Sequence, residues 1–202
     1  MKKIGVLGGA FNPPHNFHFS VAQEILNANN EFEKIIFVPV GDKYKKNDLI
    51  SAEHRYNMLK LVCDKTDNLE VSRLEIDEKE QLYAYQTLDK FSKIYPEHEL
   101  YFIIGTDSLK TLNTWSNLDY LLTTYSFLVY QRGNDNFENI LDNLPEISKY
   151  KDKIIFFNNS IWSNLSSSYI RTQINEQKRI EYLIPNEVLN YIKNNNLYNN
   201  KI

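Results

Sequence analysis

The stretch Ile4-Gly-Val-Leu-Gly-Gly-Ala-Phe-Asn-Pro-Pro-His-Asn-Phe-His18 decides the fold of this chain. Its first half is short, apolar and unalternated, which is typical of a strand that is buried on both faces of a parallel sheet. Gly8 and Gly9 then allow positive φ angles and a close approach to the backbone. After an Asn-Pro-Pro turn, His15 and His18 begin a helical pattern. Strand, glycine turn and helix start together predict an anion site, because free N–H groups and the positive end of the helix dipole face the loop.

The two histidines are three residues apart, so on a helix His15 and His18 share one face. Two imidazoles on one face can both reach the same triphosphate. A histidine pair at a helix start is also compatible with capping, or with a pair that serves only the protein surface. The preceding Gly-Gly turn favours the phosphate interpretation.

The first strand leads into a parallel crossover. A second buried strand is predicted at Lys34–Pro39, and the chain reaches it through a helix of residues 18 to 28. Strand, helix and strand in this order predict a right-handed parallel connection. The polar loop of residues 41 to 48 then lies at the same edge of the sheet as the first motif. By itself, such a loop is typical of a solvated charged surface.

The remaining elements follow from the same periodicities. Ser51 is expected to cap a helix that runs through Val62. A further helix is predicted at Tyr83–Tyr95, and further strands at Leu69–Ser72, Glu99–Gly105, Thr124–Tyr130 and Lys153–Phe157. The weakly periodic stretch 133–150 predicts a loop and a short helix, and the Asn-rich stretch 194–200 predicts a frayed end. No composition shift or linker divides the chain before that stretch, so we expect one domain over residues 1–202.

Two later stretches carry residues suited to a nucleotide. Asp107 follows a buried strand, where it serves either as an N-cap or as a ligand contact in the crevice of a doubly wound sheet. Trp115 offers a flat apolar face to a heteroaromatic ring, or fills the core. Ser166 and Ser167 stand at a predicted helix start, and Arg171 adds a charged fork that suits phosphate oxygens. A serine run before a helix is also compatible with simple capping.

Composition excludes several classes of function. The chain has 202 residues, a net charge of −3 and 42% hydrophobic residues, so it can build a proper core but lacks the basic footprint of a general nucleic-acid binder. It begins Met-Lys-Lys and a strand, without a signal-peptide pattern, and no apolar run approaches the length of a membrane span. We therefore expect a soluble, cytoplasmic protein that binds neither nucleic acid nor membrane. The single cysteine, Cys63, cannot form an internal disulfide and is expected to be a small core residue.

The quoted motif resembles the signature of the nucleotidyltransferase superfamily that carries an HxGH-type motif, and within it the bacterial nicotinate-nucleotide adenylyltransferases. Ile104-Gly-Thr-Asp-Ser-Leu109, followed by Trp115, resembles the family's Gly-x-Asp-Ser…Trp element. Leu165-Ser-Ser-Ser-Tyr-Ile-Arg171 resembles its Ile-Ser-Ser-Thr-x-Ile-Arg motif, and Leu183 to Tyr198 resembles its terminal helix and Leu-Tyr ending. The likeness thus spans almost the whole chain.

This chain departs from the family pattern in three places. Phe17 stands where the family usually has glycine. The loop of residues 43–46 lacks the prolines and the histidine of the family's Pro-Pro-His-Lys element. The segment Tyr83–Leu88 keeps only Tyr83, Thr87 and Leu88 of the family's Ser-Tyr-Thr-x-Asp-Thr-Leu element.

The resemblance implies an α/β fold with a doubly wound, mainly parallel sheet, of the Rossmann-like nucleotidyltransferase kind. ATP and a pyridine mononucleotide would bind at the carboxyl ends of the strands. The phosphate of nicotinate mononucleotide would attack the α-phosphorus of ATP and release pyrophosphate. The protein then supplies positioning and charge neutralisation rather than a nucleophile. No Asp/Glu cluster in the sequence looks like a dedicated metal cage, so we expect Mg²⁺ to arrive with ATP and no metal ligands from the protein.

The resemblance also implies a role for individual residues, with the C-terminal helices from about residue 166 completing the ATP site. The implied catalytic residues are His15, His18 and Arg171. The implied ATP-binding residues are Gly8, Gly9, Ala10, Phe11, His15, His18, Lys45, Lys46, Gly105, Asp107, Ser166, Ser167 and Arg171. The implied mononucleotide-binding residues are Asn12, Tyr83, Ala84, Tyr85 and Trp115.

Two alternatives to the nicotinate acceptor stay open. A sibling transferase that uses nicotinamide mononucleotide or phosphopantetheine would share the phosphate motifs and differ around Tyr83 and Trp115. A catalytically silent nucleotide-binding module would explain Phe17 and the altered lysine loop. The sequence leaves the oligomeric state open, homo-oligomers included. We expect the nicotinate acceptor to win by a reduced margin, because helix-start amides near residue 84 can bind its carboxylate whatever the side chains are.

Overall fold

The computed structural model describes residues 1–28, 30–46, 48–158, 161 and 163–199. Its centre is a parallel sheet of six strands in the order β3-β2-β1-β4-β5-β6. The strands are β1 (Lys2–Gly9), β2 (Phe32–Pro39), β3 (Leu69–Val71), β4 (His98–Gly105), β5 (Ser126–Tyr130) and β6 (Ile154–Phe157). The strand order reverses between β1 and β4, and this is the topological switch point of a doubly wound sheet. The predicted fold class is confirmed.

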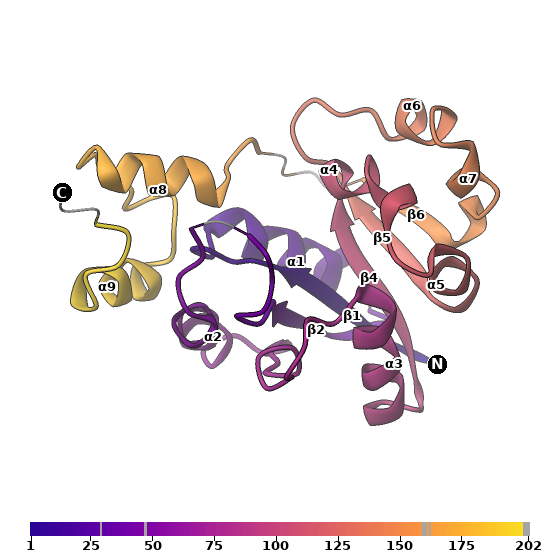
Figure 1. The fold of residues 1–202 in the computed structure, drawn as a ribbon, viewed down its shortest axis with the longest axis horizontal. Helices are drawn as coiled ribbons and strands as arrows, with labels where there is room; N and C mark the ends of the chain where they lie inside the picture. The colour runs from indigo at the N-terminus through magenta and orange to yellow at the C-terminus, as the bar shows by residue number, and fades with distance from the viewer. Residues whose placement is uncertain (29, 47, 159–160, 162, 200–202) are drawn as a thin grey trace.

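The helices connect the strands and cover the sheet (Figure 1). The longer ones are α1 (Asn16–Ala28), α2 (Ala52–Cys63), α3 (Ala84–Ile94), α5 (Leu118–Thr124), α8 (Ser167–Asn175) and α9 (Asn186–Asn194). The short ones are α4 (Thr106–Leu109), α6 (Phe137–Asp142), α7 (Pro145–Ser148) and the 3₁₀ turns η1 (Leu112–Thr114) and η2 (Lys151–Lys153).

In the described part of the chain, three apolar clusters hold these layers together. Leu88 of α3 and Leu121 of α5 belong to the cluster on one face of the sheet, and Ile25 of α1 and Leu59 of α2 to the cluster on the other. A third cluster joins α8 and α9 to α2 at the end of the molecule where the C-terminus lies, and Met58 of α2 is part of it (Figure 1). The C-terminal helices therefore pack on the domain through buried apolar side chains.

The decisive first strand is packed so closely that it needs glycine. A Cβ atom on Gly5 would lie 2.5 Å from Cδ1 of Ile35 and 2.6 Å from Cδ1 of Ile103. Buried β-branched side chains of the two neighbouring strands thus occupy the space where a larger residue would sit. This is how a strand buried on both faces comes to combine apolar residues with glycine.

Two predictions of local structure need correction. The stretch 133–150 holds two short helices, α6 and α7, rather than one. The C-terminal stretch is anchored at Leu197 and Tyr198 rather than frayed there, since Leu197 is buried in the third cluster and the hydroxyl of Tyr198 contacts Asn12. In the sequence, these two contact residues are hard to recognise because polar asparagines surround them. Residue 200 of the same prediction lies outside the described residues.

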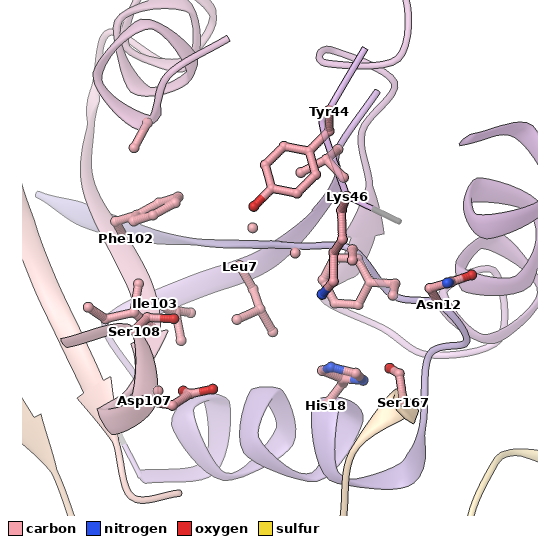
Figure 2. A pocket seen from close by; sticks show the side chains of 18 of the residues that line it. Leu7, Asn12, His18, Tyr44, Lys46, Phe102, Ile103, Asp107, Ser108 and Ser167 are labelled. Atoms are coloured by element: carbon pink, nitrogen blue, oxygen red, sulfur yellow. The ribbon is translucent and has the colours of Figure 1, made fainter. Parts of the chain in front are cut away.

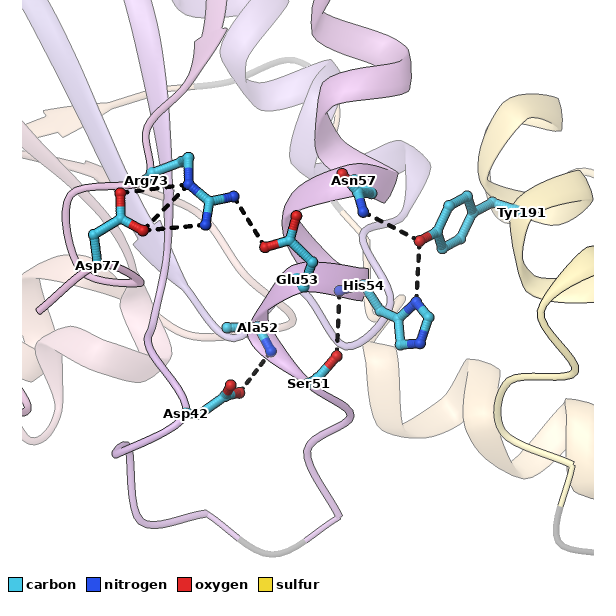
Figure 3. A network of polar contacts seen from close by, with 9 residues as sticks. All are labelled: Asp42, Ser51, Ala52, Glu53, His54, Asn57, Arg73, Asp77 and Tyr191. Carbon is cyan, nitrogen blue, oxygen red and sulfur yellow. Dashed lines mark hydrogen bonds and ion pairs between the residues drawn. The ribbon is translucent and has the colours of Figure 1, made fainter. Parts of the chain in front are cut away.

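Two further predictions concern single features of the chain. Cys63 is buried, and burial raises the pKa of its thiol to about 12, so it behaves as a core residue. Ser51 caps α2 by accepting a hydrogen bond from the backbone N–H of His54, as predicted (Figure 3). Within the described part of the chain, no helix is both long enough and apolar enough to cross a membrane.

Candidate active site

A cleft of about 550 Å³ opens at the carboxyl ends of β1 and β4, at the switch point of the sheet. The residues that sequence analysis placed there and that line it are Gly8, Gly9, Ala10, Phe11, Asn12, His18, Lys46, Tyr83, Ala84, Gly105, Asp107, Trp115, Ser166, Ser167 and Arg171. Figure 2 shows Lys46, His18 and Ser167 on one side of it and Phe102 and Ile103 on the other. His15, Lys45 and Tyr85 are not among the lining residues.

The turn after β1 owes its shape to Phe11 rather than to the glycines. Phe11 has a φ of 47°, whereas Gly8 and Gly9 belong to the strand. The glycines are needed for space, because a Cβ atom on Gly8 would lie 3.1 Å from Cζ of Phe102 and one on Gly9 would lie 3.2 Å from Cζ of Phe11. The close approach to the backbone was predicted, but the left-handed residue is the one that follows.

The two histidines stack on one another at the start of α1. Their ring centroids lie 3.6 Å apart with an interplanar angle of 20°. His18 lines the cleft, while His15 lies behind it and is 1% exposed. The backbone N–H of His15 donates to Nδ1 of His18 over 3.1 Å, so Nε2 carries the proton in neutral His18. Among the described residues, neither ring nitrogen of His15 has a hydrogen-bond partner.

Burial keeps both histidines neutral. Burial, with a smaller contribution from Arg132, lowers the pKa of His15 to about 3. Burial, followed by the neighbouring His15 and by Arg132, lowers the pKa of His18 well below its usual value. At neutral pH the cleft therefore meets His18 as an uncharged N–H donor.

Phe17, the departure from the family motif, does not line the cleft. Its side chain is 4% exposed and packs edge to face against Tyr130, with ring centroids 5.8 Å apart. The extra bulk is accommodated in the core beneath β5.

The start of α8 reaches the turn after β1 from the far end of the chain. Ser166 caps α8 by accepting from the N–H of Tyr169, and the hydroxyl of Ser167 donates to the carbonyl of Pro13 over 2.8 Å. Arg171 donates from Nη1 to the carbonyl of Asn12 over 2.8 Å. Ser166 is thus a helix cap, and both serines also line the cleft, where phosphate binding remains a prediction.

A buried arginine joins the loops around the cleft. Arg55 is fully buried and donates to the carbonyls of Ala10, Val40 and Ile50 at 3.0, 2.7 and 3.0 Å. These carbonyls belong to the turn after β1 and to both ends of the loop after β2. Asp42 in that loop accepts from the N–H of Ala52 at the start of α2 (Figure 3). Both lysines of the anchored loop are exposed, and Lys46 lines the cleft whereas Lys45 does not.

The cleft also contains residues that sequence analysis did not name. Arg132 follows β5 and donates from Nη1 to Oδ2 of Asp107 over 2.9 Å, so Asp107 holds an arginine rather than capping α4. Tyr44 and Glu75 line the opposite end. A charged residue two positions after a buried parallel strand is the signal that would have identified Arg132.

The end of the cleft near α3 combines aromatic side chains with amides. Tyr83 is the N-cap of α3, and the N–H groups of Ala84 and Tyr85 have no partner within that helix. The ring of Tyr85 packs against Tyr120 instead of facing the cleft. Trp115 both lines the cleft and packs edge to face on Phe102, with ring centroids 5.9 Å apart, so its core and binding interpretations are compatible.

Glu75 lies at this end of the cleft and is held by α3. Oε1 of Glu75 accepts from the hydroxyl of Thr87 over 2.7 Å. Burial raises the pKa of Glu75 to about 7. In the described part of the chain, no three or more His, Cys, Asp or Glu side chains are grouped to hold a metal ion.

Comparison with known proteins gives one consistent result. The model of the cytidylyltransferase-like family matches residues 6–173. A probable nicotinate-nucleotide adenylyltransferase of Clostridium tetani is 35% identical over 201 residues, which are 98% of this chain and 100% of the relative. One of Clostridium botulinum (strain Okra) is 37% identical over 197 residues, which are 96% of this chain and 97% of the relative. The solved nicotinic acid mononucleotide adenylyltransferase of Plasmodium falciparum, complexed with NaAD, superposes with a TM-score of 0.82 at 25% identity, covering 98% of both chains.

Proposed function

The chain belongs to the cytidylyltransferase-like family, among relatives named probable nicotinate-nucleotide adenylyltransferases, and we propose that it transfers the adenylyl group of ATP to nicotinate mononucleotide. A phosphate oxygen of the mononucleotide forms a bond to the α-phosphorus of ATP. The bond from that phosphorus to the bridging oxygen of the β-phosphate breaks, and pyrophosphate leaves. The products are nicotinate adenine dinucleotide and pyrophosphate. The observation that carries this proposal is the full-length similarity to relatives of one named activity.

The reaction needs no nucleophile from the protein, because the attacking phosphate is already anionic. We assign His18, Arg171 and Lys46 to the phosphates of ATP, with the start of α8 adding backbone N–H groups. The assignment is supported by their common position along the cleft. His18, as a neutral Nε2–H donor, offers a hydrogen bond to the charge that develops on the phosphates without the cost of burying a cation. His15 acts through His18, against which it stacks.

Arg132 extends the cationic side of the cleft. Its guanidinium pairs with Asp107, which fixes the fork while leaving further N–H donors for an anion. Mg²⁺ enters as part of the Mg·ATP substrate. We propose the whole chain as one functional unit, in which the C-terminal helices from about residue 166 complete the ATP site.

We assign the α3 end of the cleft to the pyridine mononucleotide. The backbone N–H of Ala84, at the start of α3 and in the lining of the cleft, suits the carboxylate of nicotinate, since a helix start favours an anion. Trp115 offers a face for the pyridine ring. We assign Asn12 to the mononucleotide as well, since it also lines the cleft. Glu75 favours nicotinamide mononucleotide as a second candidate acceptor, because its carboxylate form accepts from an amide NH₂ and repels a carboxylate.

A single assay tests the activity and the choice of acceptor. Purified protein is mixed with Mg·ATP and one acceptor at a time: nicotinate mononucleotide, nicotinamide mononucleotide or phosphopantetheine. Pyrophosphate release and dinucleotide formation are followed together. We expect equimolar pyrophosphate and dinucleotide, and the highest kcat/KM with nicotinate mononucleotide. Binding of ATP without turnover on any acceptor would instead identify a silent nucleotide-binding module.

A further inference from the structure

The C-terminal Tyr198 reaches into the turn beside the cleft. We propose that Tyr198 is a positioning residue, which orients the Asn12 side chain for binding of the acceptor mononucleotide. The inference rests on the proposed function, in which Asn12 contacts the mononucleotide. Tyr198 itself does not line the cleft, so any effect it has on the acceptor must pass through another residue.

Asn12 lies where four distant segments converge. Its side chain is 2% exposed, and its amide Nδ2 donates to the carbonyl of Asp48 over 2.7 Å. Its Oδ1 accepts from the hydroxyl of Tyr198 over 2.9 Å and from the N–H of Ile50 over 3.4 Å. Its backbone carbonyl accepts from Arg171. The loop after β2, helix α8 and the C-terminal segment therefore all bind the turn after β1 at this residue.

These contacts leave one donor of Asn12 for a ligand. An asparagine amide has two acceptor positions on oxygen and two N–H donors on nitrogen. Tyr198 and Ile50 occupy both acceptor positions, and Asp48 takes one N–H. Among the described residues, the second N–H has no acceptor, and Asn12 lines the cleft. The Tyr198 hydroxyl donates the shorter of the two bonds to Oδ1, so together with the bond from Nδ2 to Asp48 it keeps the amide in this orientation.

Tyr198 is itself held in place. Leu197 is buried in the cluster formed with α9 and α2, and its N–H donates to the carbonyl of Ile192 over 3.0 Å. Tyr198 has a φ of 62°, a left-handed conformation that is uncommon for an aromatic residue and persists where surrounding contacts determine it. Burial raises the pKa of its phenol, so the group remains an O–H donor at neutral pH. A donor that does not ionise suits a fixed acceptor on Asn12.

The test removes only the hydroxyl, with Tyr198→Phe, and compares Tyr191→Phe as a matched control. Tyr191 belongs to the same C-terminal region, but its hydroxyl contacts His54 and Asn57 on α2 rather than Asn12 (Figure 3). Both variants lose one tyrosine hydroxyl at the junction with the domain. We expect Tyr198→Phe to raise KM for nicotinate mononucleotide roughly 3- to 10-fold, while KM for Mg·ATP stays within about 2-fold. Tyr191→Phe should leave both constants at wild-type values.

A double variant shows whether the effect passes through Asn12. In an Asn12→Ala background, Tyr198→Phe should change the acceptor KM no further. Equal KM values in Tyr198→Phe and wild type, or the same rise in Tyr191→Phe, would overturn the inference and leave the transferase assignment standing. If the wild type transfers nothing, the transferase assignment fails instead. In that case the inference about Tyr198 is decided by calorimetric titration of the wild type and the same variants with nicotinate mononucleotide. It would be rejected if Tyr198→Phe bound the mononucleotide with unchanged affinity, or if neither the wild type nor any variant bound it.

Discussion

At the scale of single residues, burial keeps two histidines of the site uncharged. His18 meets the cleft as a neutral donor because it is partly buried, stacks on another imidazole and lies near an arginine, all of which lower its pKa. A neutral N–H donor holds no counter-ion. It can therefore stabilise the charge of the transition state without first releasing one. The same burial fixes its geometry through the bond from the N–H of His15 to Nδ1.

We expect His18→Ala to lower kcat roughly 100-fold, the effect of losing one preorganised donor. The folded protein should persist, because His18 lies at the cleft surface rather than in an apolar cluster. Steady-state kinetics with nicotinate mononucleotide and Mg·ATP measures kcat, and thermal unfolding checks the fold. A variant with near-normal kcat would remove His18 from the catalytic group.

Glu75 predicts a pH dependence of acceptor choice. Its pKa of about 7 means that the carboxyl is neutral below that pH and ionised above it. As pH rises through about 7, the carboxylate repels nicotinate and accepts from nicotinamide, so the ratio of kcat/KM for nicotinate over nicotinamide mononucleotide should fall. Titration of the acceptor phosphate affects both substrates alike and cancels in the ratio. Glu75→Gln should flatten the profile, and an equally steep fall in that variant would exclude Glu75 as its cause.

At the scale of elements, the start of α8 does two things at once. Its serines cap the helix and bind the turn after β1, and its arginine fork reaches the same turn. A helix that begins at the cleft presents both N–H groups and a cation to an anion. The geometry depends on the fork, because one arm of Arg171 already holds the carbonyl of Asn12.

Arg171→Lys should therefore weaken ATP binding although the charge is kept. A lysine ammonium is a point charge and cannot bind the carbonyl and a phosphate with separate planar donors. We expect Kd for a non-hydrolysable ATP analogue to rise roughly 10-fold in calorimetric titration. The control is Arg179→Lys, an exposed position outside the cleft that should bind as wild type does. Unchanged affinity and turnover in Arg171→Lys would reduce the arginine to a structural tie.

At the scale of the whole molecule, a doubly wound sheet and a C-terminal helical layer meet around one cleft. The sheet brings the ends of β1, β4 and β5 to one edge. The C-terminal helices α8 and α9 pack against α2 through the third apolar cluster, and from that side they close this edge of the sheet. Arg55 connects the loops between them, and its loss would leave three carbonyls without their donor.

The buried histidines predict how global stability depends on pH. The folded-state pKa of His15 is about 3, against 6.5 when unfolded, so the folded state resists protonation. The contribution of His15 to stability is present above pH 6.5 and is lost as pH falls from there toward about 3. The slope from one such group is about 1.4 kcal/mol per pH unit. Urea unfolding of wild type and His15→Gln across this range measures it, and the variant should show the shallower slope; parallel curves would contradict the assignment.

The sequence by itself determined what depends on neighbours along the chain. Apolar runs such as Ile4–Leu7 predicted the strands, because burial on both faces leaves no room for alternation. Serines such as Ser51 and Ser166 predicted helix starts, because a hydroxyl satisfies amides two or three residues ahead. Strand followed by crossover then implied parallel pairing, and the loops after strands implied where a ligand would bind. The family resemblance added the identity of the reaction.

Only the tertiary structure decided which side chains meet. Lys45 and Lys46 are equivalent in the sequence, and the anchoring of their loop by Asp42 and Arg55 brings only Lys46 to the cleft. His15 was predicted as the partner of His18 on one face, and packing placed it behind His18. The contact between Tyr198 and Asn12 joins residues 186 positions apart and leaves no local periodicity to detect. Such contacts depend on how all the side chains of the chain pack together, and any short stretch of sequence determines only a part of that packing.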